Sequence, residues 1–274
     1  MKKKSKISTL KTKFVKDKVM KQEHIAYIRT LYPEASEIFR PDVMGMIREV
    51  YVVRDFGDEK FVCRFEKENV AMHNLYVSKL LREHDIPVPD VSIHKCNNEF
   101  CETYPFIEGK TLHQRLDEGL KGEKLDEVYR QVFSVAYKIA QIPCDDAANI
   151  EMPLTTRCIL GLFNVLNPKS RELCHCDLYS KNILLDENDN LRSLIDLDSV
   201  TNLSLRFSFM VTIRDAHLYG YDVRKLEKLA TEYNQAYGAI GVKQQLKLYY
   251  GIRKIFRLFL TDGMRKQLLK IKVK

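Results

Sequence analysis

The first part of the chain alternates between short apolar segments and polar turns. Apolar and β-branched residues over 49–65 flank the turn sequence Asp55-Phe56-Gly57-Asp58, which predicts a β-hairpin. Met72, Tyr76 and Leu80, joined by Leu75 and Leu81, then recur at helical spacing, and we expect them to form the apolar stripe of a helix. This part of the chain therefore predicts two paired strands followed by a helix.

Proline and glycine mark the next boundaries. Ile86-Pro87-Val88-Pro89 ends the helix and predicts extended chain. Residues 99–107 read as a further strand, and Glu108-Gly109 closes it with a turn before a short helix that starts at Leu112. A boundary between two lobes fits this turn.

A helical half follows, interrupted by one hairpin. One apolar stripe covers about four turns of helix, formed by Leu125, Val128, Val132, Val135, Ala136 and Ile139. Two apolar segments, 183–185 and 191–197, flank the turn-rich residues 186–190 and predict a small hairpin. Residues 222–260 return to helical periodicity, so the predicted fold class is α+β, with a small β-rich lobe and a larger, mainly helical lobe.

The charge is unevenly distributed. The net charge is +8 over 274 residues, yet residues 1–22 alone carry +8 and residues 251–274 carry +7, which leaves −7 for the residues between them. The acidic body lacks the basic and aromatic pattern of a nucleic-acid binder. The basic ends are either solvated tails or a peripheral contact with the inner face of an anionic membrane.

The sequence also indicates the compartment. No segment approaches the ~20 consecutive apolar residues of a membrane span. Seven cysteines make an odd number with no C-x-x-C pair, which is typical of free thiols in a reducing environment. We therefore expect a cytoplasmic protein, and no specific protein partner is predicted.

One segment, residues 175–198, contains the candidate catalytic and metal-binding residues. His175, Asp177 and Asn182 match H-x-D-x-x-x-x-N, and Asp196 follows nineteen residues after Asp177. Phosphoryl transfer needs a carboxylate that orients the incoming hydroxyl and oxygen ligands that hold Mg²⁺ against the nucleotide phosphates. Asp177 suits the first task, and Asn182 and Asp196 suit the second. The hairpin between them is expected to bring these groups together. Cys174 and Cys176 do not predict zinc, because no second pair completes a tetrahedral site.

These residues resemble the catalytic and metal-binding loops of the aminoglycoside phosphotransferase and choline kinase families, which have a protein-kinase-like fold. The resemblance extends over roughly residues 45–240, although only residues 175–198 are specific. It implies that Asp177 is catalytic, that Asn182 and Asp196 bind Mg²⁺, and that the second substrate is ATP. The resemblance does not decide whether Asp198 also binds the metal. It implies that His175 supports the backbone of the loop and takes no part in the chemistry.

The resemblance also assigns the nucleotide site. Arg64 stands where a strand residue of such kinases contacts the phosphates, and Arg can clamp a phosphate group. The helix position that holds an orienting glutamate in such kinases is Asn74 here, with Glu66 or Glu68 as substitutes. The phosphate-covering loop maps to residues 43–47, which have a single glycine.

Backbone groups near Tyr104 and Phe106 are the expected partners of adenine, while Pro105 can offer only its carbonyl. Protein kinases have a lysine two residues after the catalytic aspartate, and this chain has Tyr179 there. The departure favours a small-molecule acceptor over a protein.

The sequence therefore predicts a kinase that transfers the γ-phosphate of ATP to a hydroxyl of a sugar, aminoglycoside, choline-like or lipid-linked acceptor. Two alternatives stay open: a nucleotide-binding pseudokinase with a regulatory or scaffolding role, and a lipopolysaccharide-type sugar kinase at the membrane surface. The second rests on residues 248–260, which are apolar and contain Arg253, Lys254 and Arg257, although a core helix followed by a solvated tail is the favoured interpretation of the same residues. We expect an extension over 1–22, a nucleotide-binding lobe over 23–107, and an acceptor-binding catalytic lobe over 108–274. Arg214, Asp215, His217 and Tyr221 are candidates for the acceptor wall.

Overall fold

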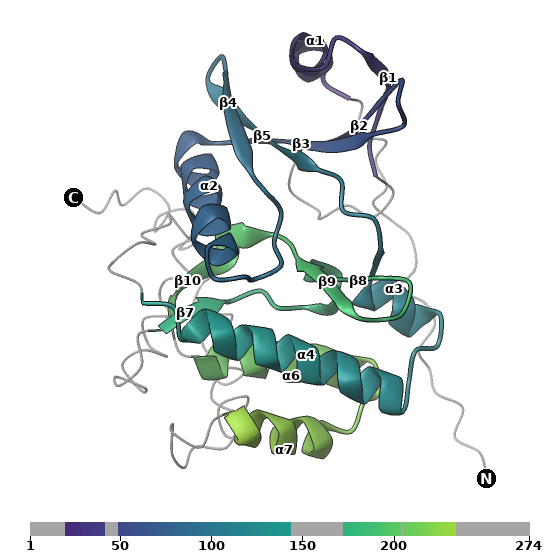
Figure 1. Cartoon of the computed structure of the whole chain (residues 1–274), viewed down its shortest axis with the longest axis vertical. Helices are drawn as coiled ribbons and strands as arrows, with labels where there is room; N and C mark the ends of the chain where they lie inside the picture. The colour runs from purple at the N-terminus through teal and green to yellow at the C-terminus, as the bar shows by residue number, and fades with distance from the viewer. Residues whose placement is uncertain (1–19, 42–48, 144–171, 204, 234–274) are drawn as a thin grey trace, which may run out of the picture.

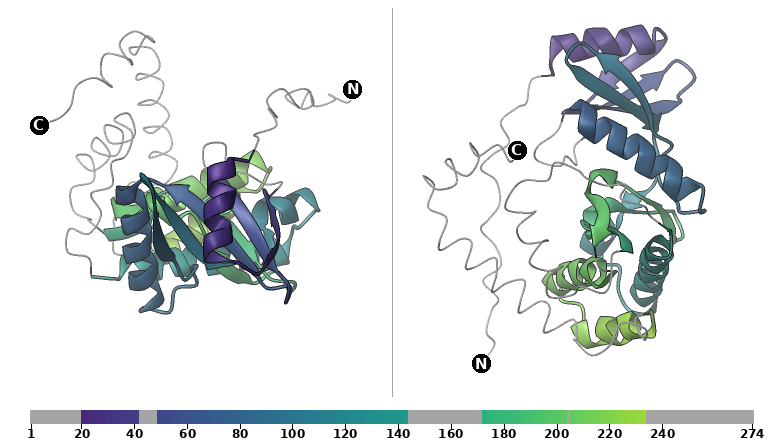
Figure 2. Two further views of the ribbon diagram at one scale, coloured as in Figure 1. Left: turned by 90° about the horizontal axis from the view of Figure 1, so that it is seen from above. Right: turned by 90° about the vertical axis from the view of Figure 1, so that its left-hand side faces the viewer.

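The chain folds into a β-rich lobe and a mainly helical lobe, which lie one above the other (Figures 1 and 2). The computed structural model describes residues 20–41, 49–143, 172–203 and 205–233. The predicted α+β class with a smaller sheet lobe and a larger helical lobe is confirmed. Residues 106–109 connect the two.

An antiparallel sheet forms the first lobe, with strand order β1-β2-β3-β5-β4. Its strands are β1 (Ala35–Phe39), β2 (Glu49–Asp55), β3 (Lys60–Glu66), β4 (Ser92–Cys96) and β5 (Glu99–Pro105). The predicted hairpin is confirmed, since β2 and β3 pair from Glu49↔Phe65 to Arg54↔Lys60 around the turn at residues 55–58. β5 pairs with β3 along its whole length, which places its end beside the centre of the sheet.

Helix α1 (Gln22–Leu31) covers one face of this sheet (Figure 1). The buried ring of His24 stacks on Phe65 with centroids 3.7 Å apart. The same ring makes a hydrogen bond of 2.9 Å with Oε2 of Glu99. Burial lowers the pKa of His24, so the ring is neutral in this contact. The contacts attach α1 to the sheet and leave the opposite face for α2.

Helix α2 (Glu68–Arg82) occurs where the sequence predicts it, but it buries a different face. Met72 and Tyr76 are 49% and 46% exposed, so these two residues of the predicted stripe do not face the core, whereas Leu80 packs partly buried against it and Leu81 is fully buried. The buried face consists of Ala71, His73, Asn74, Val77, Ser78 and Leu81. Half of these residues are polar, and two of them hydrogen-bond to buried groups: Asn74 to Glu102, and Ser78 to the carbonyl of Pro89.

The second lobe is a helical layer. Its helices are α3 (Leu112–Asp117), α4 (Glu123–Ala140), α6 (Leu205–Leu218) and α7 (Val223–Tyr233). The apolar stripe predicted for α4 packs into the core, with Val135 only partly buried. α6 is buried over nearly its whole length from Leu205 to Ile213 and packs against α4 and α7. The sequence did not predict α6.

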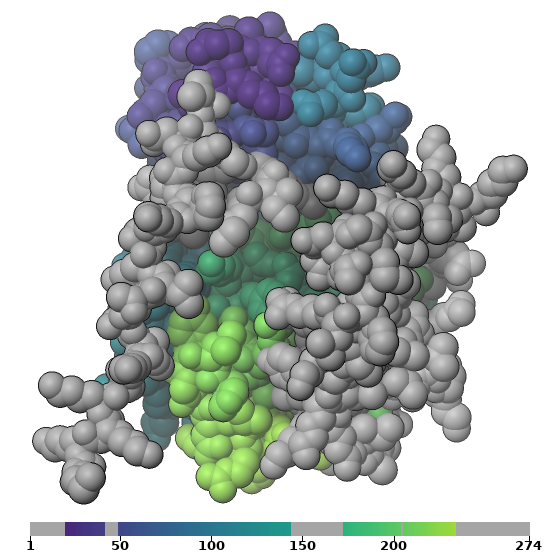
Figure 3. Space-filling model, turned by 180° about the vertical axis from the view of Figure 1, so that it is seen from behind, coloured from purple at the N-terminus to yellow at the C-terminus, as the bar shows by residue number. Residues whose placement is uncertain are grey.

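Two small sheets lie between the five-stranded sheet and the helices of the second lobe (Figure 1), and Figure 3 shows green atoms of this part of the chain between the blue and the yellow-green atoms. β7 (Glu172–His175) pairs with β10 (Val200–Leu203), and β6 (Lys110–Thr111) pairs with the hairpin of β8 (Ile183–Leu185) and β9 (Leu191–Leu194). The predicted hairpin is confirmed, although β9 ends three residues early because Leu197–Ser199 form a 3₁₀ turn. His175 ends β7, and the segments that follow β7 and β9 carry Asp177, Asn182 and Asp196.

Some predictions concern residues outside the described ranges. They are the phosphate-covering loop at 43–47, residues 1–19 of the basic extension, and the segments 248–260 and 251–274. None of the helices in the described part of the chain has the length and apolar character needed to cross a membrane.

Gly109 provides a test of the connection between the lobes. Its φ is +148°, and a Cβ there would lie 2.4 Å from the carbonyl oxygen of Leu185. Gly109→Ala should therefore destabilise the protein by about 2–3 kcal/mol in urea unfolding, since strain adds to a backbone clash. Gly119→Ala is the matched control, because φ is +97° with open space around it; equal losses for the two variants would contradict the close contact.

Candidate active site

The loop after β7 positions Asp177 and Asn182. β7 ends at His175, and a 3₁₀ turn over Ser180–Asn182 returns the chain to β8. The side-chain nitrogen Nδ2 of Asn182 donates to the backbone oxygen of Asp177 at 2.8 Å and to Oδ2 of the Asp177 carboxylate at 3.1 Å. The structure therefore brings these two residues into direct contact. The Oδ1 atom of Asn182 is not used in either bond.

His175 holds this loop to the next one. Its buried ring donates from Nε2 to the carbonyl oxygen of Ile195 at 3.0 Å and accepts at Nδ1 from the amide of Asp177 at 3.3 Å. Burial lowers the pKa of His175, which favours the neutral ring that these two bonds require. The geometry gives His175 a structural contact with both loops.

Asp196 lies beside Asn182 because the β8–β9 hairpin closes between them. Ile183 pairs with Leu194, and the next residue out, Ile195, donates its amide to the carbonyl of Asn182 at 3.0 Å. Asp196 then adopts a left-handed conformation with φ +66° and ψ +58°. Such backbone strain in a residue other than glycine is concentrated at functional sites.

Arg64 joins the two lobes at this point. Its Nη1 lies 3.1 Å from Oδ1 of Asp196, and its Nη2 lies 3.5 Å from Oδ1 of Asp198. Nη2 is buried and makes no hydrogen bond within the described residues. Nη2 thus has an ionic partner in Asp198 but no hydrogen-bond acceptor among these residues, and a phosphate oxygen is a suitable acceptor.

Two glutamates of the sheet lobe hold Arg64 from the other side. Oε1 of Glu66 accepts from Nε of Arg64 at 2.8 Å, and Oε2 of Glu102 lies 3.9 Å from the same nitrogen. Burial disfavours the charge on Arg64, but the surrounding carboxylates outweigh it and keep the pKa of Arg64 above its ordinary value. Of the substitutes expected for the helix glutamate, Glu66 makes this contact, and Glu102 was not predicted.

Asn74 acts on Glu102. Its buried amide donates to Oε1 of Glu102 at 2.8 Å. Burial raises the pKa of Glu102 to about 7, while Arg64 and Asn74 both work to lower it. The helix therefore carries an amide, Asn74, where such kinases carry a glutamate. The glutamate near Arg64 is Glu102, which lies on β5 and is held by that amide.

The acids of the site crowd one another. Burial, and then the charge of Asp196, raise the pKa of Asp198 to about 8. Burial also opposes ionisation of Asp196, but a hydrogen bond from Asp198 and the charge of Arg64 outweigh it, and the pKa of Asp196 is lowered. Burial and Asp196 raise the pKa of Asp177 to about 6, so Asp177 and Asp196 act on each other across one site.

These groups fit a hard cation. The unused Oδ1 of Asn182 and the carboxylates of Asp196 and Asp198 form an oxygen donor set, and the crowding of the two acids is relieved by positive charge. Among the described residues, no group of three or more His, Cys, Asp or Glu side chains is arranged to hold a metal ion. An ion here would depend on the amide of Asn182 and on oxygen atoms of a nucleotide and of water.

The segment predicted to meet adenine needs one correction. The amide of Phe106 donates to the carbonyl of Lys60 at 2.8 Å, so it is engaged with β3. Backbone groups alternate along an antiparallel strand, hence those of Tyr104, opposite Val62, also face β3. The Pro105 carbonyl faces away from β3, and the pairing with β4 ends at Thr103, so among the described residues no strand pairs with this end of β5 on the side away from β3. The sequence could not show this, because the alternation depends on the strand register.

The phenol of Tyr104 is close enough to Arg64 for the two groups to interact electrostatically. Burial raises its pKa to about 12, and the charge of Arg64 acts on it in the opposite direction. Its side chain thus lies within electrostatic reach of the cation that contacts Asp196.

The predicted acceptor wall separates into two groups. Arg214 and Asp215 contact the loop that carries Asp177, since Arg214 bonds to Tyr179 and Asp215 accepts from the amide of Ser180. Tyr221 instead donates to Asp126 and packs on Tyr129 with ring centroids 5.1 Å apart. It is a packing residue, and His217 is exposed.

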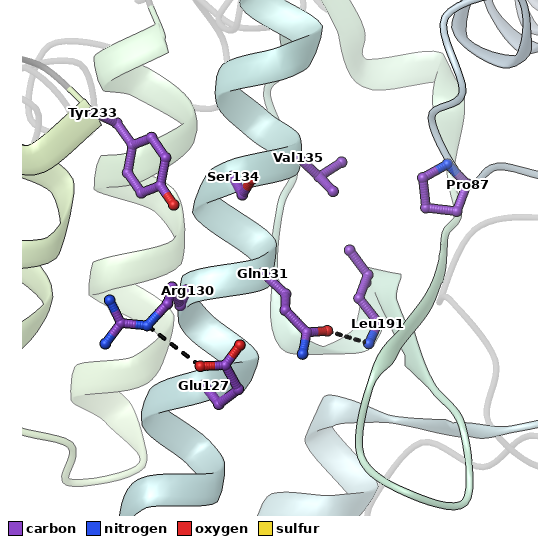
Figure 4. Close-up of a pocket in the computed structure, with 8 residues that line it drawn as sticks. All are labelled: Pro87, Glu127, Arg130, Gln131, Ser134, Val135, Leu191 and Tyr233. Carbon is purple, nitrogen blue, oxygen red and sulfur yellow. Dashed lines mark hydrogen bonds and ion pairs between the residues drawn. The ribbon is translucent and has the colours of Figure 1, made fainter.

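A cavity of about 350 Å³ lies elsewhere, between α4, β9 and the end of α7 (Figure 4). It is lined by Pro87, Glu127, Arg130, Gln131, Ser134, Val135, Leu191 and Tyr233. None of the predicted site residues lines it, so its side chains offer controls for variants of the site.

Comparison with known proteins supports the fold. No protein-family model matches the sequence, and no curated protein matches it either. Among solved structures, a GDP and kanamycin complex of APH(2")-IIIa has a TM-score of 0.63 at 15% identity, covering 90% of this chain and 93% of that one. Aminoglycoside phosphotransferase APH(3'')-Id from Streptomyces rimosus has a TM-score of 0.60 at 15% identity, covering 84% and 97%.

Amicoumacin kinase hAmiN, solved with AMP-PNP and Ca²⁺, has a TM-score of 0.54 at 10% identity, covering 93% of each chain. These likenesses define the class of fold. The chain has the protein-kinase-like fold of the aminoglycoside phosphotransferases.

The contact between Asn74 and Glu102 gives a prediction about stability. Asn74→Asp removes the donor and sets two buried acids against each other, so it should cost about 2–3 kcal/mol of unfolding free energy at pH 8. The loss should be smaller at pH 5.5, because the pair can then share a proton. Chemical unfolding at the two pH values measures it.

The double variant Asn74→Asp/Glu102→Gln is the matched control. The new amide at position 102 can donate to the new carboxylate at position 74, so the negative charge lies on the helix instead of on β5. The double variant should recover most of the lost unfolding free energy at pH 8. Equal losses at both pH values, or no recovery in the double variant, would contradict the contact.

Proposed function

We propose that this protein is an ATP-dependent phosphotransferase that acts on a hydroxyl group of a small molecule. The observation that carries the proposal is the convergence of Asp177, Asn182, Asp196 and Arg64 on one site from two lobes. The fold supports it, since solved structures that share the fold are kinases, some with ADP or GDP. We also propose residues 23–107 as the nucleotide-binding lobe and 108–274 as the lobe of the acceptor.

The nucleotide has a suitable place on the sheet side. Adenine would lie at the side of β5 that faces away from β3, where the Pro105 carbonyl can accept a hydrogen bond from its amino group. Tyr104 would line the same space with its phenol. Arg64 would contact the phosphates with its buried Nη2, while Glu66 and Glu102 orient its guanidinium.

The residues divide the chemistry among them. Asn182 and Asp196, with Asp198 beside them, would hold Mg²⁺, which supplies charge neutralisation to the phosphates when bound. Asp177 orients the acceptor hydroxyl and takes its proton. Its pKa of about 6 suits this exchange, because such a carboxylate is ionised at neutral pH yet basic enough to accept a proton.

The acceptor is proposed only as a class. Solved structures with this fold contain kanamycin, streptomycin or gentamicin. A sugar or aminocyclitol hydroxyl is therefore the first acceptor to test, followed by choline-like molecules. A chain that binds MgATP and transfers to none of a broad panel would favour the nucleotide-binding pseudokinase instead.

Two aspartate variants separate catalysis from binding. Asp177→Asn should reduce transfer to any acceptor by about 10²–10⁴-fold, because the amide cannot take a proton, with MgADP affinity nearly unchanged. Asp196→Ala should weaken Mg²⁺-dependent ADP binding as well. Calorimetry with MgADP and an assay of phosphate transfer or release from ATP measure the two effects.

Asp58→Asn is the control, since Asp58 lies in the exposed β2–β3 turn with φ +64°, a conformation that Asn tolerates. It should match the wild type in both assays. Full turnover in Asp177→Asn would remove Asp177 from the proposed role.

A further inference from the structure

Helix α6 is fixed to the loop that carries Asp177 by polar contacts along one face. Ser208, Thr212 and Asp215 are spaced so that they lie on the same side of a helix. Each meets a backbone group of the loop: the carbonyl of His175 at 2.9 Å, the carbonyl of Leu178 at 3.0 Å, and the amide of Ser180 at 2.7 Å. The position of α6 therefore determines which of its side chains reach the site.

Arg214 is the cation that this arrangement brings to Asp177. Its Nη1 donates to the hydroxyl of Tyr179 at 3.0 Å, and its guanidinium carbon lies 5.9 Å from the centroid of that ring. The half-buried guanidinium is within electrostatic reach of Asp177, whose pKa it lowers against the larger effect of burial. Arg214 reaches the site from the helical lobe, whereas Arg64 reaches it from the sheet.

We propose that Arg214 is a second catalytic cation, which neutralises the phosphoryl group as it passes from the nucleotide to the acceptor. The inference rests on the proposed function. Tyr179 stands two residues after Asp177 and has no charge at neutral pH, and Lys181, the cation of this loop, is exposed. Tyr179 instead holds the guanidinium of Arg214 by a hydrogen bond and by its ring.

The transfer step shows what the cation does. The acceptor oxygen forms a bond to the γ-phosphorus and gives its proton to Asp177, while the bond from that phosphorus to the bridging oxygen breaks and ADP leaves with the electron pair. Negative charge is spread over the phosphoryl oxygens as they move toward the helical lobe. Arg64 would stay with the phosphates of ADP, and Arg214 would meet the group that moves.

The test compares binding of MgADP with binding of MgADP plus aluminium fluoride, which imitates the phosphoryl group in transit. Calorimetry on the wild type should show at least about 100-fold tighter binding with fluoride. Arg214→Gln should lose most of that gain, while its affinity for MgADP alone stays within about two-fold, since a cation aimed at the moving group is worth about 10²–10³-fold. Arg214→Lys should keep part of the gain.

A relocated charge distinguishes a catalytic cation from a structural one. Tyr179→Lys/Arg214→Gln places the cation on the loop and should recover part of the gain, which a mere structural contact between Arg214 and Tyr179 would not allow. Arg130→Gln is the control, because Arg130 pairs with Glu127 beside the separate cavity of Figure 4 and should behave as wild type. Melting temperatures of all variants check that each is folded.

The outcomes separate the two proposals. If the wild type gains affinity with fluoride and Arg214→Gln gains as much, the inference about Arg214 is wrong and the proposed function stands. Equal loss of MgADP affinity with and without fluoride, or no recovery in the relocated variant, also overturns it. A wild type that binds no MgADP overturns the proposed function, and this inference with it.

Discussion

The structure depends on one buried arginine surrounded by acids from both lobes. Arg64 on β3 contacts Glu66 and Asp196, with Glu102 and Asp198 close by. A buried cation is costly unless it is paired, and buried acids are costly unless a cation offsets them. The need to satisfy Arg64 therefore fixes how the sheet lobe meets the strained turn at Asp196. The acids outnumber this single cation, which gives the site room for further positive charge.

The helical lobe supplies the rest by geometry. The β8–β9 hairpin brings Asn182 next to Asp196. His175 hydrogen-bonds to the backbone of Asp177 in one loop and of Ile195 in the other. α6 then holds residues 175–180 from beneath through side-chain contacts with the backbone. Asp177 is thus positioned by parts of the chain that are far apart in sequence, and its raised pKa follows from the resulting burial and from Asp196.

Much of this arrangement could be predicted from the sequence, and the failures have physical causes. The β2–β3 hairpin and the spacing of Asp177, Asn182 and Asp196 are local, so turn chemistry and spacing were sufficient. Met72 and Tyr76 were wrongly predicted to face the core, because the buried face of α2 contains polar residues such as Asn74 that a search for apolar periodicity leaves out. α6 was missed because it is buried nearly all round and shows no amphipathic period.

The part played by Glu102 and the orientation of Phe106 depend on strand register, which no local pattern reveals.

The central claim is that the acids around Arg64 form a site for a metal-bound nucleotide. A crystal structure with Mg²⁺ and a non-hydrolysable ATP analogue tests it most directly. The account predicts Mg²⁺ bound to Oδ1 of Asn182 and to the carboxylate of Asp196, with Arg64 on a phosphate oxygen. A nucleotide bound elsewhere, or an Arg64 that contacts only its four acids in the complex, would contradict it.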